Sequence, residues 1–182
     1  MPELPFEIWK DRIDNEIKGL ERLNVLEKES VIKDEDAVEM IINIDAFGFI
    51  KEMGELKPKK SHRIYLKINR SFPYPGGIDF SWYSPIYHPN IHPVQLDNGK
   101  PGTGYICLNV LKKWSRLSDL DTTVKALKML VENPNPEDPL NYDVCLDATE
   151  FFKNNSMEEL KKRYDFQSTE DEDNNDIIIL DD

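Results

Sequence analysis

The sequence predicts an α+β domain with an N-terminal helix, a four-stranded antiparallel meander sheet and C-terminal helices. Apolar residues near the start recur at helical spacing, three later segments alternate as strands do, and helical spacing returns after a long irregular segment. Because the alternating segments follow one another without helices between them, neighbouring strands are expected to pair antiparallel. With 182 residues and 39% hydrophobic content, the chain suits one domain with a packed core.

The first helix is predicted over residues 6–22, directly after Pro5, since proline suits the first turn of a helix. Its apolar positions fall on one face: Phe6, Trp9, Ile13, Ile17 and Leu20. Alternation places three of the four strands, over residues 38–44, 64–68 and 78–82. The charged segment from Lys51 to Ser61 is predicted to be a loop.

The helices after residue 116 are predicted from capping residues and apolar spacing. The first of them ends at Asn133, which precedes a proline. The predicted N-terminal caps are Ser118, with Asp121 completing a capping box, Asn141, and Ser156 with Glu159. Trp114, which precedes these helices, is predicted to lie in the core.

The formal net charge of −12 argues against two classes of partner. A chain this acidic lacks the clustered basic residues that bind a nucleic-acid backbone, and anionic membrane surfaces would repel it. No apolar run approaches the roughly 18 residues of a membrane span, and the start does not resemble a secretory signal. We therefore expect no nucleic acid and no membrane as partners, and a cytoplasmic or nuclear protein.

The two cysteines, Cys107 and Cys145, are too few for a disulfide framework or a four-cysteine zinc site. His88 and His92, with Cys107 downstream, could suggest a metal site. Pro89 between the histidines argues against a helix that presents both of them, and no fourth ligand is suitably spaced. We expect no metal and no cofactor.

The acidic residues concentrate at the C-terminal end. Residues 167–182 contain seven acidic residues and no basic or aromatic one, and without them the net charge is −5. Such composition is typical of disordered segments. The sequence therefore predicts a folded core over residues 1–166 and a disordered acidic tail over residues 167–182.

The irregular segment over residues 83–116 carries a set of motifs in a fixed order. They are Tyr-His-Pro-Asn-Ile at 87–91, Ile-Cys-Leu-Asn-Val-Leu at 106–111, Trp-Ser at 114–115 and, downstream, Pro-Asn-Pro-Glu-Asp-Pro-Leu-Asn at 134–141. With these motifs the chain resembles the ubiquitin-conjugating enzymes, as a divergent member with an acidic tail. The resemblance covers about residues 6–166 and makes residues 1–166 the expected catalytic core.

The resemblance implies a transferase in which Cys107 accepts ubiquitin, or a related modifier, from an activating enzyme as a thioester. A thioester is energy-rich yet exchangeable, and cysteine forms it readily. Asn90 would then donate a hydrogen bond to the tetrahedral oxyanion, and Asp138 would orient the attacking lysine amine. The residues alone leave two plainer roles open, with Asn90 satisfying backbone groups of its loop and Asp138 capping a turn.

Other positions near the motifs are expected to be structural. The resemblance implies a structural role for three residues at the site: His88, Pro89 and Leu140. The His88 imidazole is expected to be hydrogen-bonded within its loop rather than to act as a base. Cys145 lies on the apolar side of a predicted helix without a flanking motif and is expected to be a small buried apolar residue.

The chain departs from the family pattern at four places. The segment from His92 to Gly104 is about nine residues longer than usual, and its glycines and prolines predict no regular structure. We expect it to be mobile and to regulate access to Cys107. The positions that contact ligases are altered, because Gly76 replaces an apolar residue and Arg116-Leu117 follows Trp-Ser in place of proline. The glycine pair usual before the third strand is also missing.

The identity of the modifier stays open. Cys-Leu-Asn-Val-Leu and Pro-Asn-Pro-Glu-Asp-Pro-Leu-Asn resemble enzymes that carry the cullin-modifying ubiquitin-like protein. The methionine-led extension of those enzymes is absent from the sequence, so ubiquitin is placed first. A non-catalytic variant of the fold, which only binds modifiers or ligases, is the other alternative, and Cys107 in its motif argues against it. The partners implied are a modifier, an activating enzyme and a ligase of uncertain type.

The tail contains an apolar tetrapeptide between acidic residues: Ile177, Ile178, Ile179 and Leu180. It resembles a SUMO-interacting motif, which adds as a strand to the sheet edge of a modifier. Two alternatives remain: a solubility tail whose apolar patch folds back on the domain, or acidic residues that bind a basic ligase surface.

Overall fold

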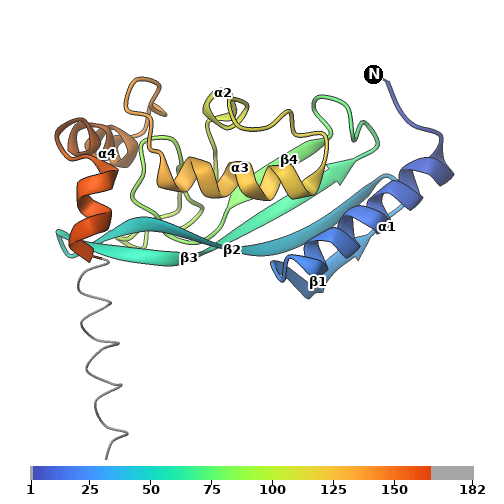
Figure 1. Cartoon of the computed structure of the whole chain (residues 1–182), viewed down its shortest axis with the longest axis horizontal. Helices are drawn as coiled ribbons and strands as arrows, with labels where there is room; N and C mark the ends of the chain where they lie inside the picture. Colours follow the sequence, from blue (N-terminus) through green and yellow to red (C-terminus); the bar gives the residue numbers. More distant parts are fainter. Residues whose placement is uncertain (1, 165–182) are drawn as a thin grey trace, which may run out of the picture.

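The computed structural model describes residues 2–164, and within them four antiparallel strands form a sheet in the order β1-β2-β3-β4 (Figure 1). The strands are β1 (Leu26–Lys33), β2 (Ala37–Glu52), β3 (Glu55–Asn69) and β4 (Ile78–Trp82). The helices are α1 (Phe6–Arg22), α2 (Leu108–Leu111), α3 (Leu120–Glu132) and α4 (Asp143–Asn154), and a further helix covers residues 157–164. The predicted α+β class, the meander order and the bounds of the first helix are confirmed.

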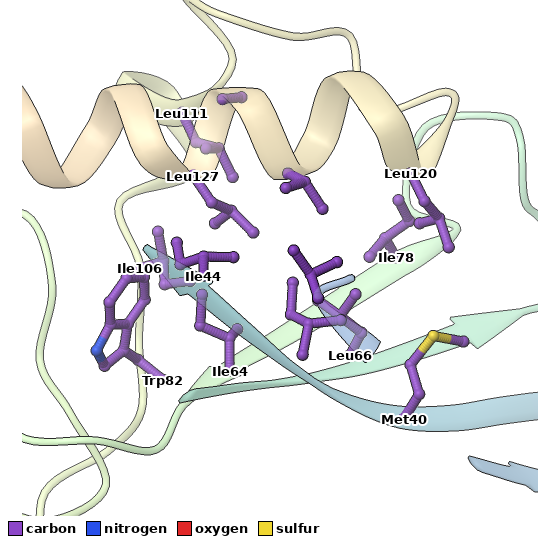
Figure 2. Packing of buried hydrophobic residues seen from close by; sticks show 14 of the residues in the cluster. Met40, Ile44, Ile64, Leu66, Ile78, Trp82, Ile106, Leu111, Leu120 and Leu127 are labelled. Carbon is purple, nitrogen blue, oxygen red and sulfur yellow. The ribbon is translucent and has the colours of Figure 1, made fainter. Parts of the chain in front are cut away.

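The main core lies between the sheet and α3, which runs across one face of it (Figure 1). Alternate residues of β2 and β3, among them Ile44, Ile64 and Leu66, point from the sheet toward Leu120 and Leu127 of α3 (Figure 2). Each such side chain stabilises the fold by about 1.5–3 kcal/mol through burial. The α3 helix is therefore fixed on the sheet and can carry the loops that flank it.

The long β2–β3 hairpin corrects one prediction. Lys51–Ser61 is not a loop: it contains the ends of both strands, which pair from Glu52 and Glu55 down to the base. The turn is only Met53-Gly54. Charged side chains on the open face hid the strand alternation, while the other face packs in a second cluster with α4 and the helix over 157–164.

The strand that alternation did not place is β1. It pairs with β2, but its register shifts between Glu27 and Ile32, and its burial runs in pairs rather than alternating. A bulge of this kind removes the period of two on which the prediction depends.

Two of the three predicted caps are displaced by one residue. The carboxylate of Asp119, rather than Ser118, caps α3 by accepting from the Thr122 N–H at 2.7 Å. The α4 helix follows Tyr142, which makes no side-chain cap, rather than Asn141. Ser156 is confirmed, since its hydroxyl accepts from the Glu159 N–H at 3.1 Å.

The predicted domain boundary at residue 166, the acidic tail and its motif at Ile177–Leu180 lie outside the described residues. Within residues 2–164, no helix has the length and apolar character that a bilayer crossing requires.

Candidate active site

The Cys107 thiol stands at the start of a short helix, and its backbone is tied to the histidine-proline-asparagine loop. The Cys107 N–H donates to the Asn90 carbonyl at 2.9 Å, and an adjacent antiparallel bridge joins Ile91 to Ile106. Cys107 precedes α2, where its own carbonyl accepts from the Leu111 N–H at 3.1 Å. Only 9% of Cys107 is exposed, so the thiol lies at the edge of the core and not on a free loop.

His88 holds the loop against α3. Its Nε2 lies 2.8 Å from the Leu130 carbonyl, and its Nδ1 accepts from the Asn90 N–H at 3.0 Å. These partners require the proton on Nε2. Burial lowers the pKa of His88 to about 4, so the ring is neutral near pH 7. The expected bond within the loop is present for Nδ1, while the other nitrogen reaches α3. With both nitrogens occupied, His88 has no free position for proton transfer.

The buried Asn90 side chain links two loops that are 45 residues apart. Its Nδ2 donates to the carbonyls of Asn135 and Asp138, both at 2.9 Å, and its Oδ1 accepts from the Asn135 N–H at 2.8 Å. Alongside, the Pro89 carbonyl accepts from the Leu140 N–H at 3.0 Å. We call these contacts the Asn90 clamp. They satisfy the backbone of the loop over residues 134–140, which is the plainer of the two roles predicted for Asn90.

The clamp brings the Asp138 carboxylate beside the cysteine. Asp138 Oδ2 lies 3.9 Å from Cys107 Sγ, and the Asp138 side chain is exposed to solvent. The structure therefore brings Cys107, Asn90 and Asp138, the three predicted catalytic residues, close to one another. It also gives the three expected structural residues contacts that support the loops, since His88 and Pro89 bond to neighbouring segments and Leu140 packs on the main core.

The insertion over residues 92–104 has more regular structure than predicted. It forms a small hairpin with a bridge between Gln95 and Pro101, and Val94 N–H donates to the Trp82 carbonyl at 2.8 Å. Gly102 has no room for a side chain, because a Cβ there would collide with the Pro93 carbonyl. The expectation of no regular structure is wrong, because backbone pairing and a close approach fix the segment despite its glycines and prolines. Its mobility stays a prediction.

The comparison with protein families agrees with this geometry. A family model described as ubiquitin-conjugating enzyme matches residues 13–167. The chain belongs to the ubiquitin-conjugating enzyme family.

Curated relatives within this family carry different modifiers by name. The chain is 35% identical over 80 residues to the probable ubiquitin-conjugating enzyme E2 31 of Arabidopsis thaliana, covering 43% of this chain and 44% of that protein. It is 39% identical over 77 residues to the ubiquitin-conjugating enzyme E2 N of Drosophila melanogaster, covering 42% of each. It is 34% identical over 83 residues to the NEDD8-conjugating enzyme Ubc12 of Dictyostelium discoideum, covering 43% and 32%. The matches thus span less than half the length of each relative.

The second cysteine, Cys145, is a small buried residue of α4, which agrees with the prediction from its apolar helix face. Cys145 is fully buried, its thiol donates to the Ile91 carbonyl at 3.4 Å, and burial raises its pKa to about 12. Among the described residues, no three His, Cys, Asp or Glu side chains gather into a possible metal site. The His92 ring instead stacks on Tyr142 at 4.0 Å and bonds through Nδ1 to Thr103.

The three positions predicted to contact a ligase lie together. Gly76, Arg116 and Leu117 line one hollow of about 360 Å³. Leu117 takes a left-handed backbone with φ of 58°, and Ser115 Oγ accepts from its N–H. Trp114 is 46% exposed, so the prediction that it lies in the core is wrong. Trp114 lies in the turn that follows α2, where its N–H donates to the Leu111 carbonyl at 3.0 Å.

Sequence reasoning missed the partner of the Asn90 clamp and the aromatic pair beside the insertion. Asn135 lies within a quoted motif, but its contact with Asn90 spans 45 residues and leaves no local pattern. The stacking of His92 on Tyr142 likewise joins two segments far apart in sequence. Either contact can be identified only once it is known that the segment over residues 88–92 lies beside the segment over residues 135–142 in the folded protein.

Proposed function

We propose that the protein is a conjugating enzyme that accepts ubiquitin, or a ubiquitin-like modifier, from an activating enzyme as a thioester on Cys107. It then passes the modifier to a substrate lysine or to a ligase. The observation that carries this proposal is the Cys107 thiol 3.9 Å from the Asp138 carboxylate, with both residues held by the Asn90 clamp. Membership of the ubiquitin-conjugating family supports it.

Loading is a thiol–thioester exchange. The Cys107 thiolate attacks the carbonyl carbon of the activating enzyme's thioester, a new C–S bond forms, and the activating enzyme's thiolate leaves and takes up a proton. Attacking and leaving groups are alike, so the step is nearly balanced in free energy and needs no strong base. It uses no cofactor of this protein, because the activating enzyme spends the ATP upstream.

Discharge onto lysine makes a C–N bond and breaks the C–S bond to Cys107, which leaves as a thiol. The amine must be neutral to attack, and the exposed Asp138 carboxylate can accept a hydrogen bond from it and orient it. Asn90 would donate to the tetrahedral oxyanion. Both of its N–H groups are engaged by carbonyls in the clamp, so this role requires one of those bonds to open.

Ubiquitin is the first candidate modifier, and the cullin-modifying ubiquitin-like protein is the second. Relatives named as ubiquitin-conjugating enzymes support the first candidate. Two relatives named as NEDD8-conjugating enzymes, together with the Cys-Leu-Asn-Val-Leu motif, support the second. A non-catalytic variant is disfavoured by the cysteine itself. The ligase of uncertain type would bind at the hollow lined by Gly76, Arg116 and Leu117. A cytoplasmic or nuclear location fits two free thiols.

A charging assay tests the proposal. The protein is incubated with ATP and a panel of activating enzymes and modifiers, and a reducible adduct on a gel identifies the modifier. Cys107→Ala is expected to form no adduct, Cys107→Ser at most a reductant-resistant ester, and the matched control Cys145→Ala a normal thioester. A reducible adduct on Cys107→Ala, or none from any pair, would contradict the proposal.

A further inference from the structure

A groove of about 410 Å³ lies beside the candidate site, between the insertion, the distal part of β2 and the first turn of α4. Its apolar surface comes from six residues: Ile50, Pro85, Ile86, Pro93, Leu96 and Val144. A second hollow of about 270 Å³ adjoins it, shares Ile50, Lys51, Pro85, Leu96 and Asp97 with it, and adds the oppositely charged Glu52 and Lys59. We call the larger hollow the insertion groove.

One wall of the groove exists because of the insertion. Leu96 and Asp97 occupy the tip of its hairpin. At its base the Val94 N–H donates to the Trp82 carbonyl and the Trp82 N–H donates to the Gly104 carbonyl, while the Gly102 N–H donates to the Val94 carbonyl within the hairpin. The Leu96 N–H also donates to the Lys100 carbonyl at 3.1 Å, which closes the tip. The wall is thus set by main-chain contacts.

The three carboxylates at the rim of the groove differ in whether a cation pairs with them. Asp147 is paired, because it accepts from Lys51 at 3.0 Å and from the Tyr87 hydroxyl at 2.6 Å. Asp97 and Asp143 are exposed and, among residues 2–164, neither forms a salt bridge. Apolar walls with two unpaired carboxylates at the rim match a side chain with a long alkyl stem and a cationic head. Arginine and lysine have this form.

The surface continues from the groove to the cysteine. Asp143 directly follows Tyr142, whose ring lies 6.4 Å from that of Tyr105, and Tyr105 is two residues before Cys107. Tyr105 is 58% exposed. Pro93, at the near end of the groove, is three residues from Asn90, whose carbonyl accepts from the Cys107 N–H, so the Asn90 and Pro93 Cα atoms lie at most about 11 Å apart. An extended peptide at about 3.3–3.6 Å per residue crosses that distance in three or four residues.

We propose that the insertion groove binds an arginine or lysine side chain of the acceptor protein, three or four residues from the lysine that receives the modifier. This inference rests on the proposed function and adds the chemistry of the acceptor segment. Because the carboxylates belong to the insertion and to α4, the insertion would then select acceptors and not only cover the cysteine.

The test uses the full-length protein charged with the modifier that the panel identifies. Two capped peptides carry one central lysine, with arginine or glutamine at the third and fourth positions on both sides, and free lysine is the third acceptor. Discharge should show a KM about tenfold lower for the arginine peptide at about 0.15 M salt, with little change in kcat. Asp97→Asn with Asp143→Asn should reduce this preference to less than about twofold.

Matched controls separate the groove from general attraction to an acidic protein. Asp36→Asn with Asp79→Asn removes the same charge from exposed sites outside the groove and should keep the preference. Replacing arginine by its analogue with two fewer methylenes keeps the charge, shortens the stem and should weaken the preference. Discharge onto free lysine should be unchanged in both double variants.

Binding of the fluorescein-labelled arginine peptide to uncharged protein, followed by anisotropy, gives a readout that does not depend on the thioester. Absence of any thioester would overturn the proposed function, while groove-dependent binding would still support the groove. Normal discharge onto free lysine, with equal KM for the two peptides or equal loss in the control variant, would overturn the inference alone.

Discussion

The Asn90 clamp makes a quantitative prediction about Asn90→Ala. The substitution removes three hydrogen bonds at once, two donated to the Asn135 and Asp138 carbonyls and one accepted from the Asn135 N–H. Asn90 is fully buried, so water cannot simply replace the lost partners. The loop that carries Asp138 should therefore lose both stability and position.

The expected magnitude follows from these contacts. A protein hydrogen bond contributes about 0.5–1.5 kcal/mol net, and three give about 2–4 kcal/mol. That is a large fraction of the about 5–15 kcal/mol by which a domain is stable. Asn154→Ala is the matched control, because its exposed amide makes one bond to the Glu150 carbonyl, and its cost should stay below about 0.5 kcal/mol.

Urea unfolding followed by tryptophan fluorescence measures this loss. Catalysis is measured separately, on protein that is folded at the assay temperature. If Asn90 donates to the oxyanion, Asn90→Ala should slow discharge onto lysine by about 10²–10³, and thiol-to-thiol transfer should fall less. A double variant with Asp138→Ala then separates the two roles. If Asn90 donates to the oxyanion independently of Asp138, the fold-losses in rate of the two single variants multiply in the double variant. If Asn90 acts only by positioning Asp138, the double variant is no slower than the slower of the two single variants.

Two results would refute this reasoning. A loss of stability below about 0.5 kcal/mol for Asn90→Ala would mean that the clamp contributes nothing to the fold. Equal loss of both transfer steps, in protein that remains folded, would mean general damage to the site and no specific role for Asn90 in discharge.

Further predictions follow from the same contacts. Asp138→Ala should leave charging intact and slow discharge onto lysine, more so at low pH, where less of the amine is neutral; an unchanged lysine rate would exclude the orienting role. The His88 ring, followed by NMR, should stay neutral down to about pH 5.5 and titrate near pH 4, and a midpoint near 6.5 would contradict its burial. Since the unfolded state binds that proton first, stability should fall by up to about 1.4 kcal/mol per pH unit between pH 6.5 and 4. Replacing the insertion by a tight turn should keep the fold and change the discharge rate, and an unchanged rate would make it a neutral insertion. Truncation after Gln167 should leave charging intact, and Ile178→Ala with Ile179→Ala should weaken modifier binding; binding that is salt-sensitive but indifferent to these alanines would exclude strand addition.

The sequence predicted the elements whose signal is local. The spacing of Trp9, Ile13 and Ile17 is a property of one helix, and the bounds of α1 were therefore predicted closely. The strand β1 was not placed, because its burial depends on a bulge relative to β2. The distal β2–β3 hairpin was mistaken for a loop, since the helices that cover its apolar face come about 100 residues later.

In the candidate site, too, local motifs predicted some residues, while contacts between distant segments were not predicted. Cys107 and Asp138 were predicted from motifs, and the structure brings them within contact distance. The clamp that fixes them was left as one of two roles for Asn90, because Asn135 must fold back before the amide has partners. The groove beside the insertion had no sequence signal, since it forms only where Leu96 meets residues of β2 and α4.

Under the proposed function, the contacts that build the site also protect the thioester. A carrier must react with an amine but resist water, and the most effective way to promote hydrolysis is a free imidazole that activates a water molecule. His88 is close in sequence to Asn90, yet burial keeps it neutral and both of its nitrogens are engaged. The exposed Asp138 carboxylate lies beside Cys107 and can accept a hydrogen bond from an incoming amine and orient it. Locking the imidazole therefore fixes the loop and leaves selection of the nucleophile to the acceptor that brings its lysine to Cys107.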